Sequence, residues 1–272
     1  MLTAQDVVVR ITENIGAAPR PDTVDTFLAG APEAPVAGVA VTMMATFDVL
    51  RRAVAEGLDL VITHEPLYYD HGNQAEPRLV AEDDPVHRAK AAFVAEHGLR
   101  VWHLHDAWHD RHPDGVDEGT ARALGWTGRE VPGAAGVYAL EPTTLGELAA
   151  HVASALGARA LRFVGDPALP VSGVGLDLGF RGFDRNRHLL QRDDVDVAVI
   201  GEGHEWETGA YAADLEAAGI RKGLVVVGHV PSEQEGMAEA ARWLRGLLPE
   251  LPVQFLPATD PYRTVGGAIL PA

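Results

Sequence analysis

The chain has 272 residues and a hydrophobic fraction of 47%, enough to build one large domain or two moderate ones. It has no cysteine, which excludes disulfides, thiolate metal sites and cysteine nucleophiles. The formal net charge of -17 argues against nucleic acid and anionic membranes as partners, because their phosphate groups would be repelled. No apolar run is long enough for a membrane span and the first residues lack a signal-peptide pattern, so a cytoplasmic location is expected.

Helical and strand-like patterns alternate along the first half of the chain. Apolar residues at helical spacing begin the sequence, and two later helices are expected to end at Gly57 and Gly98. The predicted helices lie within 1–16 and at 47–56, 84–97 and 115–124, and the predicted strands are 35–46, 58–63 and 99–104.

The second half follows a segment rich in Gly, Pro and Ala, residues 129–142, which we interpret as a joint. Thr144 and Glu147 then have the spacing of a capping box at the start of a helix. The predicted helices are 144–156, a short one ending at 189, 208–218 and 231–248, and the predicted strands are 161–165, 171–178, 195–200, 222–227 and 253–256.

This alternation predicts an α/β protein of two α/β lobes with mixed, partly parallel sheets. We expect an N-terminal lobe at residues 1–130 and a second lobe at residues 131–272, whose C-terminal part can return to the first.

The most informative residues are His and carboxylate side chains that follow apolar runs. Such side chains at strand exits are typical of a divalent metal site. The first cluster is His64 and Glu65, where the alternative is a capping His beside a solvated Glu.

The second cluster runs from His103 to His112 and has four histidines within ten residues. Asp110 or His109 could be a metal ligand, and a neighbouring His could orient water or transfer protons. The alternative is a polar loop with incidental histidines.

The third cluster is His229 and Glu233, four residues apart, across a strand-to-helix turn. Glu233 could bridge two cations, or it could be an ordinary acidic residue in a first helical turn. A fourth segment, residues 201–207, carries Glu202 and His204, and we favour a solvated acidic turn for it. The chain has no P-loop, GxGxxG, GxSxG or HExxH motif, which argues against the common nucleotide-binding and serine-hydrolase folds.

In chain order these segments resemble the NGG-interacting-factor-3-like family, also known as the GTP cyclohydrolase 1 type 2 family. The likeness covers nearly the whole chain through short motifs, which are GLDLVITHEPLYY, VWHLHDAWHDRHP, DVAVIGEGHEWE, GLVVVGHVPSEQEG and FLPATDPYRTV.

The resemblance implies a dinuclear metal site between two α/β domains and a ring-shaped homohexamer. Carried over by position, the metal ligands are His64, Asp110, His229 and Glu233, with Glu65 as a further ligand where the family has a second His. Glu is a harder ligand than imidazole, so the two divalent ions are expected to be Mn, Fe or Mg before Zn. If the second motif is counted from His105, the ligand position falls on His109 instead of Asp110.

The leading hypothesis is therefore a dinuclear-metal-dependent hydrolase that acts on a nucleotide or related heterocycle through a metal-activated water. His105 or His109 would relay protons as the catalytic residues. Its partner would be a small-molecule substrate, with GTP as the candidate that the family name suggests. The alternatives are a metal-binding regulatory or chaperone-type protein without turnover, and a structural oligomer without metal.

Overall fold

A computed structural model describes residues 1–263 of the chain. It has ten α-helices, one π-helix and ten strands in two five-stranded sheets within this range. The expected mixed α/β architecture is thereby confirmed. No helix of residues 1–263 combines the length and the apolar character needed to cross a lipid bilayer.

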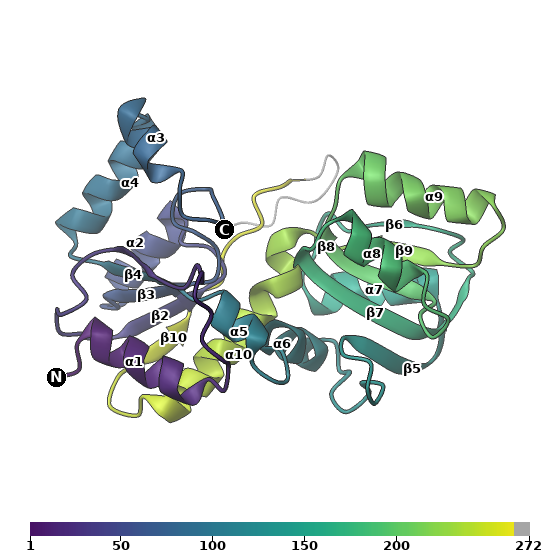
Figure 1. Ribbon diagram of the computed structural model, residues 1–272, viewed down its shortest axis with the longest axis horizontal. Helices are drawn as coiled ribbons and strands as arrows, with labels where there is room; N and C mark the ends of the chain where they lie inside the picture. The colour runs from purple at the N-terminus through teal and green to yellow at the C-terminus, as the bar shows by residue number, and fades with distance from the viewer. Residues whose placement is uncertain (264–272) are drawn as a thin grey trace. The chain divides into compact units, whose positions relative to one another are not determined.

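The chain divides into two compact units (Figure 1). The first unit contains residues 1–116 and 236–258, and the second contains residues 117–235 and those from Thr259 onward. The chain passes from one unit to the other within helix α6 (Gly115–Ala123) and within helix α10 (His229–Leu247). Residues 264 and 265, which end the last quoted motif, lie outside the described residues.

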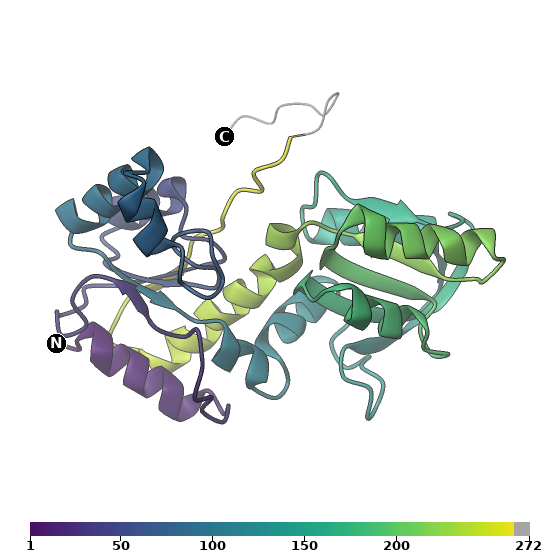
Figure 2. The same cartoon turned by 45° about the horizontal axis from the view of Figure 1, so that its top comes forward.

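The first unit has a mixed sheet in the order β1-β4-β3-β2-β10. Its central strands run parallel and every residue in them is buried, as expected for strands with helices on both faces. Figures 1 and 2 show α1 and the C-terminal half of α10 on one face and α2 and α4 on the other. The strands are β1 (Phe27–Ala29), β2 (Val39–Thr42), β3 (Leu60–Thr63), β4 (Arg100–His103) and β10 (Val253–Phe255). The helices are α1 (Ala4–Asn14), α2 (Phe47–Ala55), α3 (Glu76–Ala81), α4 (Pro85–Glu96) and α5 (Asp106–Asp110).

Local sequence signals account for most helix ends in this unit. Thr3 and Asp6 form a capping box at α1, and the Asp84 side chain accepts the backbone N–H groups that open α4. Gly57 and Gly98 follow α2 and α4 with φ of 70° and 59°, the left-handed conformation that glycine adopts without strain.

The second unit has a sheet in the order β5-β7-β8-β9-β6, with β7, β8 and β9 parallel and the two edge strands antiparallel. Alternate strand residues such as Ala198 and Ile200 pack with Leu190 and Leu215 of α8 and α9. The strands are β5 (Val137–Thr144), β6 (Arg162–Val164), β7 (Pro170–Phe180), β8 (Val197–Glu202) and β9 (Gly223–Val226). The helices are α7 (Leu145–Ala155), α8 (Phe183–Leu190), the π-helix η1 (Glu205–Gly209) and α9 (Ala210–Ala217).

The segment interpreted as a joint, residues 129–142, instead contains the first part of β5. The predicted capping box is present, because the Thr144 hydroxyl accepts from the Glu147 backbone and the Glu147 carboxylate accepts from the Thr144 N–H.

Candidate metal centre

The two parallel strands β3 and β4 end at the same level of the first sheet, with Thr63 paired to His103. His64 directly follows β3, and His105 stands two residues beyond β4 at the start of α5. Carboxyl ends of adjacent parallel strands meet at one edge of a sheet, where ligands of α/β proteins commonly bind. The predicted strand-exit histidines therefore lie side by side.

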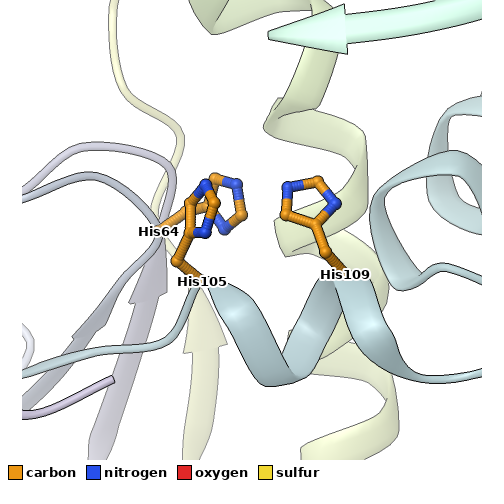
Figure 3. Close-up of side chains that lie close together, drawn as sticks. All are labelled: His64, His105 and His109. Carbon is orange, nitrogen blue, oxygen red and sulfur yellow. The ribbon is translucent and has the colours of Figure 1, made fainter. Parts of the chain in front are cut away.

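Three imidazoles gather at this edge, those of His64, His105 and His109. The rings of His64 and His105 are stacked with centroids 4.6 Å apart, and His109 lies 5.0 Å and 4.8 Å from them. One ring nitrogen from each lies within 4.8 Å of the other two, which suits a shared metal ion. Figure 3 shows His109 on the next turn of α5, with its ring facing the other two. We call these residues the three-histidine cluster.

Each imidazole of the cluster has an oxygen acceptor next to its Nδ1 atom. Because a carbonyl or carboxylate oxygen can only accept, Nδ1 carries the proton and Nε2 keeps the lone pair for a metal. The acceptors are Leu104 O for His64 (3.1 Å), Asp106 Oδ1 for His105 (3.1 Å) and Asp114 Oδ2 for His109 (2.8 Å).

Burial favours neutral rings in this cluster. Desolvation, followed by the charges of His105 and His109, lowers the pKa of His64 well below its ordinary value. Desolvation is also the main cause that lowers the pKa of His105 to about 3. Neutral imidazole is the form that binds metal, so the lowered pKa values of His64 and His105 favour metal binding by these two rings at neutral pH.

Helix α5 has only five residues, and it carries His109 in the helix and His105 at its N-cap position. Its first N–H groups donate to the carboxylate of Asp25, with distances of 2.7 Å to His105 N, 2.9 Å to Asp106 N and 2.9 Å to Ala107 N. The other end is anchored by buried Trp108, whose Nε1 donates to Gly236 O at 3.1 Å. The cluster thus rests on a short but firmly held helix.

His103 and His71 flank the three-histidine cluster. The buried His103 ring contacts the side-chain amide of Asn73 through Nδ1 (3.1 Å) and His64 O through Nε2 (2.9 Å), so it orients the backbone at His64. His71 is exposed and its ring centroid lies 4.5 Å from that of His105. His71, His105 and Asp106 form a second group that could hold a cation.

Asp110 and Glu65 were both expected as metal ligands; Asp110 is engaged by an arginine, whereas a carboxylate oxygen of Glu65 lies within 4.8 Å of a ring nitrogen of His64. Both oxygens of Asp110 accept from the guanidinium of Arg20. Glu65 directly follows His64, its backbone N–H donates to Met43 O at 2.9 Å, and its charge acts on the pKa of His103. His112, the last histidine of the second cluster, precedes Pro113.

The other two expected ligands, His229 and Glu233, belong to the second unit and form an ion pair there. His229 Nε2 lies 3.1 Å from Glu233 Oε2, and its Nδ1 lies 3.0 Å from Glu202 Oε1. The hydrogen bond to His229 lowers the pKa of the Glu202 carboxyl. The Glu233 carboxylate is buried against Gly179, because a Cβ atom added there would lie 2.3 Å from Glu233 Oε1.

These donor atoms fit a transition-metal ion. Imidazoles whose second ring nitrogen is hydrogen-bonded to an oxygen are the usual ligands of Zn and Fe sites. Sequence analysis identified the histidines but not the residues that orient them, Asp25, Asn73, Asp106 and Asp114. Only Asp106 and Asp114 had a local signal, since each is within five residues of its histidine.

The sequence profile of Duf34/NIF3 (NGG1p interacting factor 3) matches residues 22–261, which is most of the chain. The protein belongs to the Duf34/NIF3 family. No curated protein matches the chain.

Solved NIF3-related structures have the same fold as this NIF3 family member. A Staphylococcus aureus hypothetical protein, SA1388, is 15% identical with a TM-score of 0.77, and the match covers 97% of this chain and 99% of that one. A Bacillus cereus protein related to NIF3 is 15% identical with a TM-score of 0.76 and the same coverage. Reduced HcgD from Methanocaldococcus jannaschii is 13% identical with a TM-score of 0.67, covering 94% of this chain and 97% of that one.

Proposed function

We propose that this NIF3 family protein is a metal-dependent hydrolase that binds two divalent ions and acts on a nucleotide or related heterocycle. The observation that carries the proposal is the three-histidine cluster, in which every Nδ1 atom has an oxygen acceptor and one nitrogen of each ring lies within 4.8 Å of the other two. In such hydrolases a bound ion lowers the pKa of a coordinated water, which then serves as the nucleophile at neutral pH.

The residues divide between two ions in this proposal. His64, His105 and His109 hold the first ion, and the pair of His229 and Glu233 holds the second. Three imidazole nitrogens suit Zn or Fe better than Mg, which prefers oxygen ligands. Asp106 and Asp114 orient the ligands of the first ion, a role supported by their hydrogen bonds to ring nitrogens.

His109 is assigned to the metal in preference to Asp110. The proposal is supported by the ion pair that occupies both Asp110 oxygens and by the distance of His109 from its two neighbouring histidines. The sequence predicted His105 and His109 as proton relays. Both are partly buried and engaged at Nδ1, which suits ligands better. Glu65 stays a predicted further ligand.

Elemental analysis of protein purified without chelators and without a His tag tests the metal proposal. We expect bound metal in the wild-type protein and in Asp110→Ala, and a loss of metal in His64→Ala and His109→Ala. Equal retention in all three variants would exclude the three-histidine cluster as a metal site. A loss confined to Asp110→Ala would restore the carboxylate as the ligand.

Turnover separates the hydrolase from a metal-binding regulatory protein. Metal-loaded protein is assayed for release of formate from GTP and for hydrolysis of a panel of phosphoesters. Product formation that disappears in His64→Ala supports the hydrolase. Bound metal without turnover on any of these substrates favours the non-catalytic alternative. The expected ring-shaped hexamer is a separate prediction, which light scattering of the purified protein tests.

A further inference from the structure

Three aromatic side chains gather at the carboxyl ends of β7 and β8 in the second unit. Phe180 is the last residue of β7, and His204 and Trp206 follow β8. The rings of His204 and Trp206 are nearly parallel at 13° with centroids 5.2 Å apart, and Phe180 lies 5.4 Å from His204. Trp206 is 73% exposed and Phe180 is 48% exposed. We call these three residues the aromatic platform.

The platform is held in place by polar contacts, although its rings face solvent. His204 Nδ1 lies 2.9 Å from Glu207 Oε2, and Arg162 pairs with Glu205. The π-helix that carries Trp206 also contains the buried Thr208, whose hydroxyl accepts from the amide of Asn186 at 3.1 Å. Single π-helical turns are frequent at functional sites. A rigid, solvent-facing ring loses little conformational entropy when a ligand stacks on it.

The platform adjoins the residues proposed to hold the second ion. Strands β7, β8 and β9 are neighbouring and parallel, so the residues after each strand share one edge of the sheet. Glu202, which ends β8 two residues before His204, contacts His229. Gly179, which precedes Phe180, lies against the Glu233 carboxylate.

We propose that the aromatic platform binds an uncharged planar nitrogen heterocycle of purine size by stacking on Trp206. This inference rests on the proposed function, since it places the heterocycle of the substrate beside His229 and Glu233. Large exposed aromatic rings are unusual on a protein surface and often mark a binding site. Heteroaromatic bases stack on such rings with little dependence on their hydrogen-bonding pattern.

The negative charge near the platform favours contact with the heterocycle of a nucleotide and disfavours contact with its phosphate groups. Three carboxylates, those of Glu202, Glu205 and Glu207, lie in the same short segment as His204 and Trp206. Arg162 is the partner of Glu205, whereas the partners of the other two are the imidazoles of His229 and His204, so the segment stays acidic. A phosphate placed among them would be repelled, whereas a neutral base would not. The occupant is therefore the base itself.

Calorimetric titration of the full-length protein with guanosine tests the proposal, with and without a metal chelator. Trp206→Ala is expected to weaken guanosine binding by about 5- to 150-fold, the range of one base–aromatic stack. Phe180→Ala, which removes a neighbouring ring, is expected to weaken it by about 2- to 12-fold. Trp206→Phe should lose less than Trp206→Ala because a ring remains.

The matched control is Tyr262→Ala. Tyr262 also belongs to the second unit and is 72% exposed, and its removal should leave guanosine binding unchanged. Adenosine should bind like guanosine, cytidine more weakly, and ribose not at all. Guanosine should quench part of the tryptophan fluorescence of the wild-type protein, and this quenching should be absent in Trp206→Phe, which keeps the other four tryptophans.

Two results would overturn the proposal. One is guanosine affinity that is equal in the wild-type protein and Trp206→Ala. The other is a change of oligomeric state in Trp206→Ala by light scattering, which would make the platform an interface between copies. Because the titration with chelator needs no metal and no turnover, its outcome is separate from that of the metal analysis.

Discussion

Replacement of Asp114 with Asn tests whether His109 is oriented for a metal ion. Asp114 Oδ2 accepts from His109 Nδ1 at 2.8 Å, and Asp114 Oδ1 accepts the Val116 N–H at 2.8 Å. In Asp114→Asn the side chain has one oxygen and one NH2 group. The oxygen can accept the Val116 N–H only if the NH2 group faces His109. Nδ1 must then accept, and the ring proton moves to Nε2, the nitrogen needed by the metal.

The expected cost follows from this inverted tautomer. Loss of an outer hydrogen-bond partner of a ligating His typically lowers metal affinity about 10- to 100-fold. This corresponds to about 1.4–2.7 kcal/mol of binding free energy. Competition for Zn against a chromophoric chelator measures the affinity, and elemental analysis measures the bound metal. Asp114→Asn should bind metal weakly, whereas His109→Ala should lose more.

Asp84→Asn is the control, because Asp84 also accepts backbone N–H groups at a helix start. Its Oδ1 accepts from Val86 N at 2.9 Å and from His87 N at 2.8 Å, but it contacts no ring of the three-histidine cluster through these bonds. Both variants should unfold at nearly the wild-type temperature, and only Asp114→Asn should lose metal affinity. Unchanged affinity in Asp114→Asn, or an equal loss in Asp84→Asn, would refute the tautomer argument.

Three further measurements address stability. Asp25→Ala leaves three N–H groups at the start of α5 without their acceptor and should lower the free energy of unfolding by about 1–3 kcal/mol, whereas an unchanged urea midpoint would contradict the capping role. Chelator-treated protein should lose stability as pH falls below about 6.5, the ordinary pKa of His. The pKa of His105 is about 3 in the folded protein, so between pH 6.5 and pH 3 the unfolded chain binds more protons than the folded one. His105→Gln should reduce the slope of urea midpoint against pH, and an identical slope would argue against this cause. Leu60→Ala, in the fully buried β3, should cost about 2–5 kcal/mol in a urea titration, and a cost below about 1 kcal/mol would contradict close packing there.

The central strands were predictable from sequence because burial on both faces leaves long apolar runs. Residues 58–63 and 99–104 contain β3 and β4, and the glycines that end α2 and α4 lie where they were expected. Helix α3 was not predicted, since none of its residues is buried and it therefore has no apolar periodicity.

Strand β5 was missed for a different physical reason. It contains Pro142 and pairs with only one strand, β7, so it lies at the edge of the sheet where proline and exposed residues are tolerated. Its sequence therefore has the composition of a loop. The length of the antiparallel pairing, rather than the local sequence, establishes it as a strand.

The site was predictable as a set of positions but not as a set of hydrogen bonds. A His or Glu after an apolar run marks a strand exit, and in each unit parallel strands bring such exits to one edge of the sheet. The contacts that orient the side chains come from distant parts of the sequence. Asp25 is 80 residues from His105, and Asn73 is 30 residues from His103.

Helical periodicity accounts for which side chains of the second cluster lie together. His105 and His109 are four residues apart and so share one face of α5, where they meet His64. Asp106 and Asp110 are also four apart, and both pair with Arg20. If the segment is interpreted as a loop, its sequence does not indicate which of these side chains lie together. As one helical turn and a half, the segment turns His109 toward His64 and Asp110 toward Arg20, because adjacent residues of a helix point about 100° apart. Asp106 lies between the two groups, since its Oδ1 is 3.1 Å from His105 Nδ1 and 3.3 Å from Arg20 Nη1.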